Sequence, residues 1–552
     1  MKTRLLAWLC ILCMLPALAM AEDYLVGEST LTQTVMAADA TFTATEASTE
    51  MQQALALLAA GSFLSAVNAF AGISGEPDAP KYAEYAYARL LMLRDDPAAA
   101  LVKWETLSGF LDSDYQRSLC QTLRLHRFAQ NAKFGYVDAE GTWRIPPQFD
   151  WAERVFRAES VSADTAATPL PVTLVFQGQT SVTETDIEPA AGTYGLIRSD
   201  GALIVPAVYD SVLWTVSGVA AVSDASGISL IDLTSGALIG HGYEAVGAYA
   251  EGYIPVQKYG LWGYLDPQGG ALLGDGFAWD SALPFSEGKA AVSKDKQYGY
   301  IDTAANLMIP LTYTGAESFS DGLAGIRVKK KWGFIDASGE IVIKPAYAAV
   351  KTFQYGLCAV KRGDAWGLLD TTGNLVLRAK YSEIGDFDPI HRRAWVRQNK
   401  LWGLVSTAGT MVLAPSWGSH DDFNANTLCR VSYRGNYGYI DVNGNMRIFI
   451  QYEAAAPFSA DYGAVVDENG TVVYLNKNMR SFTIDTDVPV ECRQGFIEGR
   501  KRRSSQWNYI NEKGEATVIQ RWHMTFALFD QSGTPIPVTP YSAQASDQAD
   551  GA

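Results

Sequence analysis

An aromatic side chain followed by glycine recurs along this chain at a nearly constant step. From Gly263 onward, the glycines of this pair are separated by 36, 34, 34, 36 and 35 residues. A fixed period of this length indicates an array of one supersecondary unit, and such arrays present extended surfaces more readily than a single catalytic cleft. The pairs are Phe134-Gly135, Tyr194-Gly195, Trp262-Gly263, Tyr298-Gly299, Trp332-Gly333, Trp366-Gly367, Trp402-Gly403 and Tyr437-Gly438.

Each repeat has the residue pattern of short strands joined by tight turns. Counting from the glycine of the pair, position +3 is usually Asp and position +6 is usually Gly. This spacing favours a hairpin turn, because Asp hydrogen-bonds nearby backbone and Gly accepts a positive φ. Position +14 is usually aromatic, and position +20 is Phe in the later units. We expect three short strands per unit, with aromatic side chains packed between neighbouring units because one unit alone cannot cover them.

The clearest unit, residues 333–347 with Lys331-Trp332 before it, resembles the WG repeat, also called the KWG repeat. The resemblance covers about residues 133–538. It implies repeated β-sheets and a binding role, and it offers no catalytic residues to transfer. It also implies a bacterial protein that is secreted or attached to the cell envelope. A propeller-like ring and an open superhelical stack both fit units of about 35 residues.

We expect an α+β multidomain protein, with a small α-helical module followed by a long all-β repeat array. Lys2 and Arg4, the apolar stretch after them and Ala19-Met20-Ala21 are typical of a cleaved secretory signal, with an uncleaved N-terminal anchor as the alternative. The predicted parts are a signal peptide at 1–21, a flexible leader at 22–45, the α-helical module at 46–131, the array at 132–538 with an insert loop at 157–193, and a disordered tail at 539–552.

Residues 46–131 carry apolar side chains at helical spacing. The pattern from Phe63 to Phe70 recurs 34 residues later, from Pro97 to Trp104. Helix pairs of this period resemble tetratricopeptide-like helical hairpins, and a plain small helical bundle is the alternative.

The charge balance limits the kinds of partner. The chain has 44 basic and 60 acidic residues, and loss of Lys2 and Arg4 with the signal leaves 42 and 60, a formal charge of −18. Nucleic acids and anionic lipid surfaces require a basic footprint, so this charge argues against both. We expect no membrane span in the mature chain and a secreted or extracytoplasmic, envelope-associated location. Lys329-Lys330-Lys331 is interpreted as a solvated turn, with a patch for an acidic ligand as the alternative.

The sequence predicts no catalytic centre, no metal site and no cofactor. The five histidines lack metal-ligand spacing. Ser419, His420, Asp421 and Asp422 are adjacent, but a catalytic triad is defined by its geometry, so we interpret them as a polar loop. Residues 441–445 begin like a calcium loop but lack its later ligands, which favours a plain turn. Cys120, Cys358, Cys429 and Cys492 of the mature chain are too far apart to indicate a disulfide framework, and Cys358 and Cys429, at near-equivalent repeat positions, are expected to be buried small hydrophobic residues.

Aromatic residues outside the repeat register are the candidates for ligand contact. A ring found at one register in every unit is what a repeated core requires, so the remaining rings are freer to face a ligand. They are Trp143, Trp151, Trp214, Trp279 and Trp395.

These observations favour a non-enzymatic, exported binding module that engages protein or polysaccharide through its β-repeat surface, with its oligomeric state open. One alternative is an exported, glycosidase-like hydrolase whose carboxylates come from adjacent repeats, with Asp302, Asp336 and Asp370 as candidates. The other alternative is a purely structural envelope scaffold.

Overall fold

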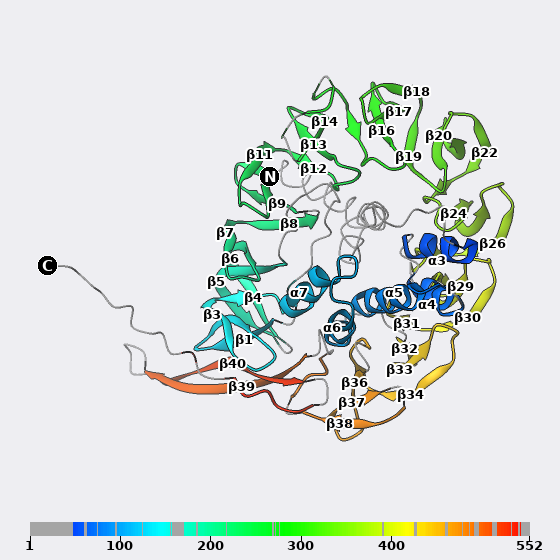
Figure 1. Cartoon of the computed structure of the whole chain (residues 1–552). Coiled ribbons are helices and arrows are strands. Elements are labelled where there is room, and N and C mark those ends of the chain that lie inside the picture. Colours follow the sequence, from blue (N-terminus) through cyan, green and yellow to red (C-terminus); the bar gives the residue numbers. More distant parts are fainter. Residues whose placement is uncertain are drawn as a thin grey trace. The chain divides into compact units, whose positions relative to one another are not determined.

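In the computed structural model, the chain forms two compact units. Unit 1 combines the N-terminal part up to Val212 with the C-terminal part from Ala454 onward, and unit 2 is Leu213–Glu453. Figure 1 shows both units with the chain coloured from its N-terminus to its C-terminus. The helices belong to unit 1, whereas unit 2 consists of β-sheets.

The structure describes most of the chain between residues 48 and 541. The predicted signal peptide (1–21) and leader (22–45) lie outside the described residues, and only Tyr541 of the predicted tail (539–552) lies within them. The described residues are 48–59, 63–73, 76–93, 97–123, 125–154, 156, 171–183, 186–216, 218–267, 270, 272–274, 276–388, 391–423, 428–458, 462–476, 478–484, 486–490, 496–510, 516–530, 533–538 and 541.

Five described helices pack one against the next in chain order. Their core includes Tyr85 and Trp104, which are buried with ring centroids 5.3 Å apart. Helices α4 and α6 begin at Phe63 and Pro97, 34 positions apart, as the internal repeat predicts. Their likeness to tetratricopeptide hairpins stays a prediction. The helices are α3 (Thr49–Ala59), α4 (Phe63–Ala71), α5 (Ala79–Leu93), α6 (Pro97–Thr106) and α7 (Ser113–Leu123).

The helical module is shorter than the predicted range 46–131. α7 ends at Leu123, and β1 (His126–Gln130) pairs with β2 (Lys133–Val137), the strand that carries the first aromatic-Gly pair. Asn131 and Ala132 close this hairpin with φ values of 54° and 60°. Residues 126–130 are therefore a strand because they hydrogen-bond to β2, a pairing that helical periodicity in the preceding segment does not reveal.

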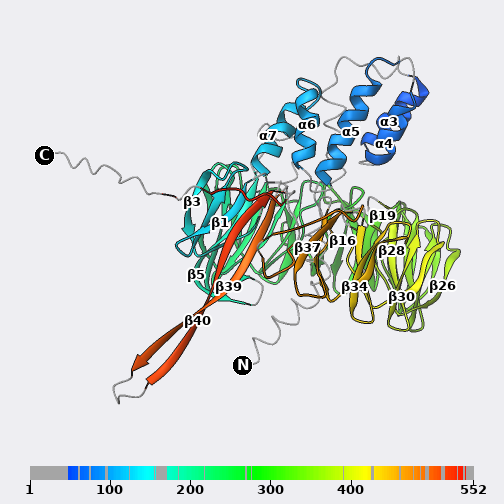
Figure 2. The same cartoon turned by 90° about the horizontal axis from the view of Figure 1, so that it is seen from below.

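Unit 1 contains small antiparallel sheets from both parts of the chain. Figure 2 shows its last two strands as a long hairpin. The first part contributes β1, β2 and β3 (Trp143–Phe149) as one sheet, and β4 (Trp151–Ala152), β5 (Val172–Val182), β6 (Ile187–Arg198) and β7 (Leu203–Tyr209) as another. The second part contributes β35 (Ala454–Ala455), β36 (Tyr462–Val466), β37 (Val472–Asn476) and β38 (Ser481–Thr483), followed by β39 (Phe496–Ile510) and β40 (Ala516–Asp530).

The insert predicted as a loop at 157–193 is in part a hairpin. β5 and β6 remain paired as far as Val182 and Ile187, well beyond the length of the strands in the other repeats. Thr183 N–H then donates to the carbonyl oxygen of Asp186, 2.8 Å away, at the closing turn. Backbone pairing therefore orders residues whose Ser- and Thr-rich composition is typical of a loop.

The sheets of unit 2 follow one another in chain order (Figure 1). Their strands are β8 (Ser211–Val216), which begins at the border of the unit, β9 (Val219–Asp224), β10 (Gly227–Asp232) and β11 (Leu238–Tyr243); β12 (Ala245–Val246), β13 (Ile254–Lys258) and β14 (Leu261–Leu265); β15 (Ser281–Ala282), β16 (Lys289–Lys294), β17 (Gln297–Asp302) and β18 (Leu307–Tyr313); β19 (Gly315–Ser320), β20 (Leu323–Val328), β21 (Lys331–Asp336) and β22 (Ile341–Tyr347); β23 (Ala349–Val350), β24 (Leu357–Arg362), β25 (Ala365–Asp370) and β26 (Leu375–Tyr381); β27 (Glu383–Ile384), β28 (Arg393–Gln398), β29 (Leu401–Ser406) and β30 (Met411–Trp417); and β31 (Ser419–His420), β32 (Leu428–Tyr433), β33 (Asn436–Asp441) and β34 (Met446–Tyr452).

Most sheets have four strands, whereas the sequence predicted three. The additional strand is often only two residues long, as in β23, and two residues are too few to show the alternation that identifies a strand. It follows directly on the outer strand of the preceding sheet, so a sheet begins before the sequence repeat ends. No closed barrel or propeller is found among the described sheets, and the ring and the open stack both stay predictions.

The glycine of the aromatic-Gly pair faces a bulge in the outer strand in every described sheet of this kind except that of Gly263, which has no outer strand. Trp366 lies opposite Tyr381, and Leu368 lies opposite Leu377. An advance of two residues along β25 therefore corresponds to four residues along β26, and the additional residues of β26 form the bulge. This bulge brings the backbone of β26 close to Gly367, where an added Cβ would lie 2.6 Å from the carbonyl oxygen of Leu377. A larger residue would push the two strands apart, which explains the glycine at this register.

Aromatic rings join neighbouring sheets, as the sequence predicted. The +14 ring Tyr381 pairs with Trp366 of its own sheet and shares a buried cluster with Ile384 of the next sheet. A direct ring contact between sheets is made by the residue after the glycine, because Tyr300 of β17 meets Phe319 of β19 with ring centroids 4.9 Å apart. Tyr300 Oη also donates to the carbonyl oxygen of Glu317, 2.8 Å away. Neighbouring sheets therefore share a core, to which positions +1 and +20 of one sequence repeat contribute from either side.

The C-terminal segment packs on the first repeat of unit 1. Within unit 2, a Cβ on the turn glycine Gly373 would meet the side chain of Ile343 in the preceding sheet at 3.3 Å. The equivalent glycine of the first repeat, Gly141, is approached instead by Pro537 and Val538. The C-terminal segment thus takes the place that a preceding outer strand takes elsewhere.

Candidate interaction surfaces

Consecutive sheets of unit 2 are aligned, with equivalent residues side by side. Ser286 Oγ donates to the carbonyl oxygen of Phe319 in the next sheet, 2.7 Å away. Ser320 Oγ makes the same bond to Phe353, at 2.6 Å. Because equivalent positions are bonded from sheet to sheet, the turns of one sheet lie beside the matching turns of the next, and unit 2 has two edges of repeated turns.

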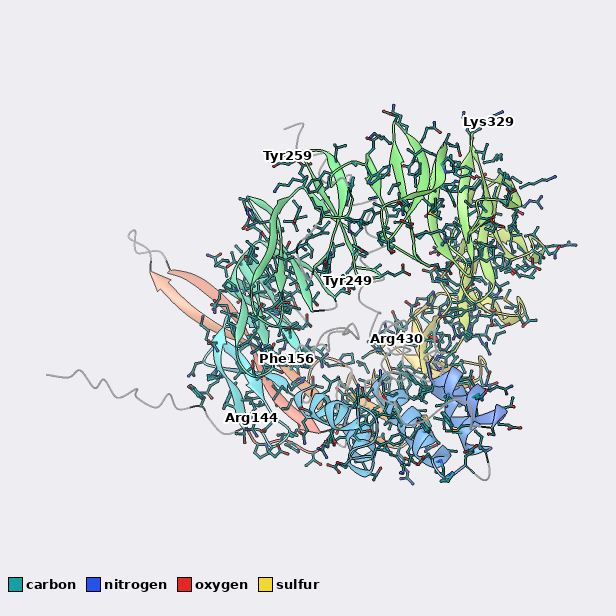
Figure 3. All side chains as sticks on the ribbon, turned by 45° about the horizontal axis from the view of Figure 1, so that its top comes forward. Arg144, Phe156, Tyr249, Tyr259, Lys329 and Arg430 are labelled. Atoms are coloured by element: carbon teal, nitrogen blue, oxygen red, sulfur yellow. The ribbon has the colours of Figure 1, made fainter. Side chains whose placement is uncertain are left out.

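One edge is formed by the hairpin turns between the second and third strands, and we call it the tip row. Its turns are tight, and Lys329, Asn399 and Lys400 have φ values of 57°, 53° and 66°. Figure 3 labels one residue in each of two tips, Tyr259 and Lys329. The tip row comprises residues 224–227, 258–261, 294–297, 328–331, 361–365, 397–401 and 433–436.

The tip row is basic although the chain as a whole is acidic. Its exposed cations outnumber its exposed carboxylates, which are Asp295 and Asp364. No ion pair joins these cations to another of the described residues, so their charge is free to act on a partner. The exposed cations are Lys294, Lys296, Lys329, Lys330, Lys331, Arg362, Lys400 and Arg434.

The opposite edge carries carboxylates that serve the fold. Gly322 N–H donates to Glu287 Oε2 of the preceding sheet, 3.1 Å away, and Gly356 N–H donates to Asp321 Oδ2 at 2.7 Å. Glu251 accepts in the same way from Gly288. These exposed carboxylates therefore join one sheet to the next.

The Asp-x-x-Gly turns also lie on this opposite edge. Asp336 Oδ1 accepts from Ser338 Oγ at 2.6 Å and from the N–H groups of Ser338 and Glu340 at 2.9 and 3.0 Å, as the turn pattern predicted. These hydrogen bonds, that of the Ser338 hydroxyl first, hold the pKa of Asp336 below its usual value. The pKa values of Asp302 and Asp370 are lowered in the same way, chiefly by Asn306 and Thr372. A carboxylate that stays ionised so readily is poorly suited to act as a general acid.

The two edges are far enough apart to act separately on a charged partner. Six-residue strands such as β20 span about 20 Å at the usual rise per residue. The Debye length at physiological ionic strength is about 8 Å, so charges on one edge are largely screened from the other. The local charge of the tip row, rather than the net charge of the chain, determines what it attracts.

Two tips also present exposed aromatic rings. The Tyr259 side chain is 79% exposed, and Lys258 Nζ lies 5.8 Å from its ring centroid. The Tyr433 side chain is 45% exposed, and the Arg434 guanidinium lies 5.2 Å from its ring. Each ring thus combines exposed surface with an adjacent cation, and Tyr259 also makes an edge contact with Phe277.

The five tryptophans predicted to contact a ligand lie in separate places and are not brought together. In unit 1, Trp143 of β3 is half-buried between Phe128 and Tyr541, and Trp151 of β4 is half-buried too. In unit 2, Trp214 of β8 and Trp279 are half-buried against two different apolar clusters, and Trp395 of β28 is 5% exposed. Their role in binding stays a prediction.

The adjacent residues Ser419 to Asp422 do not form a catalytic triad. The Ser419 hydroxyl pairs with that of Ser432 at 2.6 Å, and His420 Nδ1 lies 3.0 Å from the carbonyl oxygen of Asp421. The His420 ring stacks on Trp395 with centroids 4.1 Å apart, and burial lowers its pKa. This histidine is therefore part of an aromatic core.

Cys120, Cys358 and Cys429 are free and buried, which confirms the hydrophobic role predicted for Cys358 and Cys429; Cys492 lies outside the described residues. Burial raises the pKa of Cys358 to about 12. Within the described part of the chain, no group of three or more His, Cys, Asp or Glu side chains could hold a metal ion. No described helix is long and apolar enough to cross a membrane.

Comparison with known proteins identifies the repeats. The family described as WG containing repeat matches residues 134–159, 194–224, 230–262, 277–298, 298–332, 332–364, 366–402 and 437–471. Residues 134–471 thus carry WG repeats. The last matched repeat ends at residue 471, so it contains β35 and β36 but not β37 and β38 of the same four-stranded sheet.

Solved structures share only remote likeness with this chain. A eukaryotic initiation factor is 12% identical over 62% of this chain and 92% of its own, with a TM-score of 0.35. Hsv2p of Kluyveromyces lactis is 12% identical over 56% and 95%, with a TM-score of 0.26. PorZ, described as a surface component of the type-IX secretion system of Porphyromonas gingivalis, is 13% identical over 75% and 59%, with a TM-score of 0.23. No curated protein matches the chain.

Sequence reasoning did not identify the tip row, although a signal for it exists. The three lysines at 329–331 by themselves predict a solvated turn. Cations in fact recur two to five positions before the aromatic-Gly glycine in successive WG repeats, as Lys296, Lys330 and Lys400 do. Only the alignment of the sheets shows that these cations share one edge.

Proposed function

We propose that this WG-repeat protein is a non-enzymatic interaction module, and that the tip row of unit 2 is its binding surface for an anionic partner, either protein or polysaccharide. One observation carries the proposal. The tip row repeats exposed cations that have no ion pair within the described part of the chain, whereas the opposite edge uses its carboxylates to hold the sheets together. Exposed charge that the fold does not use is available to steer and hold a partner.

A charge-removal experiment on the full chain tests this proposal. The double variant Lys329→Ala/Lys330→Ala removes two cations from the tip row. Lys344→Ala/Arg378→Ala removes two exposed cations from the outer strands β22 and β26, so it has the same net charge. We expect the tip-row variant to weaken capture of anionic proteins or glycans and the control to leave it unchanged. If both variants capture anionic proteins and glycans equally well, the tip row is not the binding surface.

The proposal extends to the location of the protein. The basic start, apolar stretch and Ala-Met-Ala motif of residues 1–21 support export and cleavage, which would place the module outside the cytoplasm, free or attached to the envelope. N-terminal sequencing of the protein recovered from cell fractions tests this. A mature chain beginning at Glu22 in an extracytoplasmic fraction is expected, and an intact Met1 in the cytoplasm would refute export.

The hydrolase alternative has less support. Asp302, Asp336 and Asp370 each use their oxygen atoms to close a turn, and their lowered pKa values favour the ionised form. Changing each of the three to Asn in a chain screened against polysaccharides tests this alternative directly. If the unaltered chain hydrolyses a polysaccharide and the substitutions abolish that hydrolysis, the hydrolase alternative is supported.

A further inference from the structure

We propose that the ligand of the tip row is a linear acidic polysaccharide whose sugar chain runs across several consecutive hairpin tips. The inference rests on the proposed function and names the class of ligand. It combines three features of unit 2, namely regular spacing of the tips, exposed cations on them, and exposed tyrosine rings on two of them.

The regular spacing favours a polymer over a compact partner. Hydrogen bonds such as that from Ser320 Oγ to the Phe353 carbonyl oxygen align successive sheets. Packed sheets lie about 10 Å apart, so tips of neighbouring sheets repeat at roughly this interval. A ligand that carries one negative charge per sugar or per pair of sugars can meet each tip in turn. Weak contacts at successive tips then add, because each bound tip raises the effective concentration of the ligand at the next.

The exposed rings favour a sugar over an acidic peptide. Tyr259 and Tyr433 belong to the tips between β13 and β14 and between β32 and β33, and the lysine-rich tips lie between them in the chain. A tyrosine ring offers an apolar face on which a sugar ring can lie, while Lys258 and Arg434 beside the two rings can pair with a carboxylate on the same sugar. A flexible acidic peptide would need the cations but not these rings.

Local acidic groups do not cancel the tip row. Asp295 and Asp364 lie on tips that also carry Lys294, Lys296 and Arg362. Glu244 Oε2 accepts from the N–H of Gly260 at 3.0 Å, so its charge serves the turn. Each lysine-rich tip therefore keeps a positive excess toward a ligand.

The test uses the full chain and three polymers, with binding measured by calorimetry. Polygalacturonate supplies acidic sugars, poly-L-glutamate supplies carboxylates without sugar rings, and dextran supplies sugars without charge. We expect polygalacturonate to bind most tightly, its affinity to fall as salt rises, and defined oligogalacturonates to bind more tightly as they lengthen.

Two sets of variants separate charge from stacking. Lys329→Ala/Lys330→Ala should weaken polygalacturonate by about two- to fivefold per lost cation, whereas Lys344→Ala/Arg378→Ala should not. Tyr259→Ala/Tyr433→Ala should weaken polygalacturonate by about threefold or more and leave poly-L-glutamate unchanged. All these side chains are exposed, so unchanged melting temperatures are expected and serve as the folding control.

The outcomes distinguish the inference from the proposed function. Equal affinity for poly-L-glutamate and polygalacturonate, with no effect of the tyrosine changes, would overturn the sugar ligand and support an acidic protein at the same tips. Capture of an anionic protein that depends on Lys329 and Lys330, without any binding of polygalacturonate, would do the same. If polygalacturonate binds and neither set of variants alters its affinity, its site lies outside the tip row. That result would overturn both the sugar ligand and the tip row as the binding surface.

Discussion

The carboxylate of Glu287 in one sheet accepts a hydrogen bond from the backbone N–H of Gly322 in the next, with Oε2 3.1 Å from the nitrogen. Asp321 repeats this contact with Gly356 one sheet later. The bond joins two sequence repeats through a side chain that stays exposed. Stability in such an array depends on contacts between neighbours, so a change in one repeat should affect the next.

Removing this carboxylate should destabilise unit 2. We expect Glu287→Ala to lower the free energy of unfolding by about 0.5–2 kcal/mol, because the Gly322 N–H loses its acceptor. The measurement is denaturant unfolding followed by tryptophan fluorescence. Glu340→Ala is the matched control, because this exposed side chain accepts no hydrogen bond from the described residues, and its cost should stay within about 0.5 kcal/mol. Equal costs for both variants would contradict a role of the contact in coupling the sheets.

A methyl group on the aromatic-Gly glycine should be costly. In Gly367→Ala the added Cβ would lie 2.6 Å from the carbonyl oxygen of Leu377, so the bulge of β26 must shift. We expect a loss of about 1–3 kcal/mol, as for overpacked sites in general. Gly385→Ala is the control, since its Cβ would find its nearest neighbour at 3.5 Å, an ordinary contact. A thermal melt that ranked the two variants equally would contradict the close approach as the reason for this glycine.

The turn carboxylates should give unit 2 an acid-sensitive stability. The folded-state pKa of Asp336 lies below its unfolded value of 3.8, so its contribution is present above about pH 4 and is lost as the pH falls through the folded pKa. Asp336→Asn keeps the shape and removes the charge. We expect it to lower the unfolding midpoint at pH 7 and to approach the unaltered chain near pH 3. Asp364→Asn, on an exposed tip, is the control, and its unfolding midpoint should not approach that of the unaltered chain as the pH falls. If Asp336→Asn lowers the midpoint by the same amount at every pH, the ionised carboxylate does not stabilise the turn.

The buried histidine should give a second pH dependence, in a higher range. Burial lowers the folded-state pKa of His420 below its ordinary 6.5, so the unfolded chain binds the proton more readily and stability falls as the pH drops below about 6.5. His420→Phe preserves a ring stacked on Trp395 and should remove this component of the melting profile between pH 7 and pH 5. The exposed His241→Gln is the control and should retain it. An unchanged profile in His420→Phe would assign the dependence to another group.

The contact between the first repeat and the C-terminal segment should be visible in hydrogen exchange. Ile536 N–H donates to the carbonyl oxygen of Leu528 at 2.8 Å, which holds this segment beside β40. In Gly141→Ala the added Cβ would clash with Pro537, so we expect faster exchange at Ile536. Gly252→Ala has similar backbone strain, with φ at 88° and nothing within 4 Å, and should leave Ile536 protected. Protection of Ile536 in both variants would show that Gly141 does not support the segment.

Local patterns in the sequence predicted the repeated parts of the fold correctly. The aromatic-Gly step gives the number of residues per repeat. The Asp-x-x-Gly pattern locates the hairpin turns, and Asp336 closes its turn by hydrogen bonds as expected. These features depend on contacts within a few residues or across one hairpin, and such contacts leave a periodic trace. The family match over residues 134–471 confirms the identification of the repeats.

What the sequence by itself determined was the repeat, its turns and the small or apolar character of its buried positions. Only the tertiary structure decided that a two-residue strand such as β23 completes many of the sheets, that Tyr300 meets Phe319 of the next sheet, and that Trp395 is buried. It also decided that Lys296, Lys330 and Lys400 share one edge. The physical reason is that these relationships depend on how sheets align across more than thirty residues, and no local pattern of residues encodes that alignment.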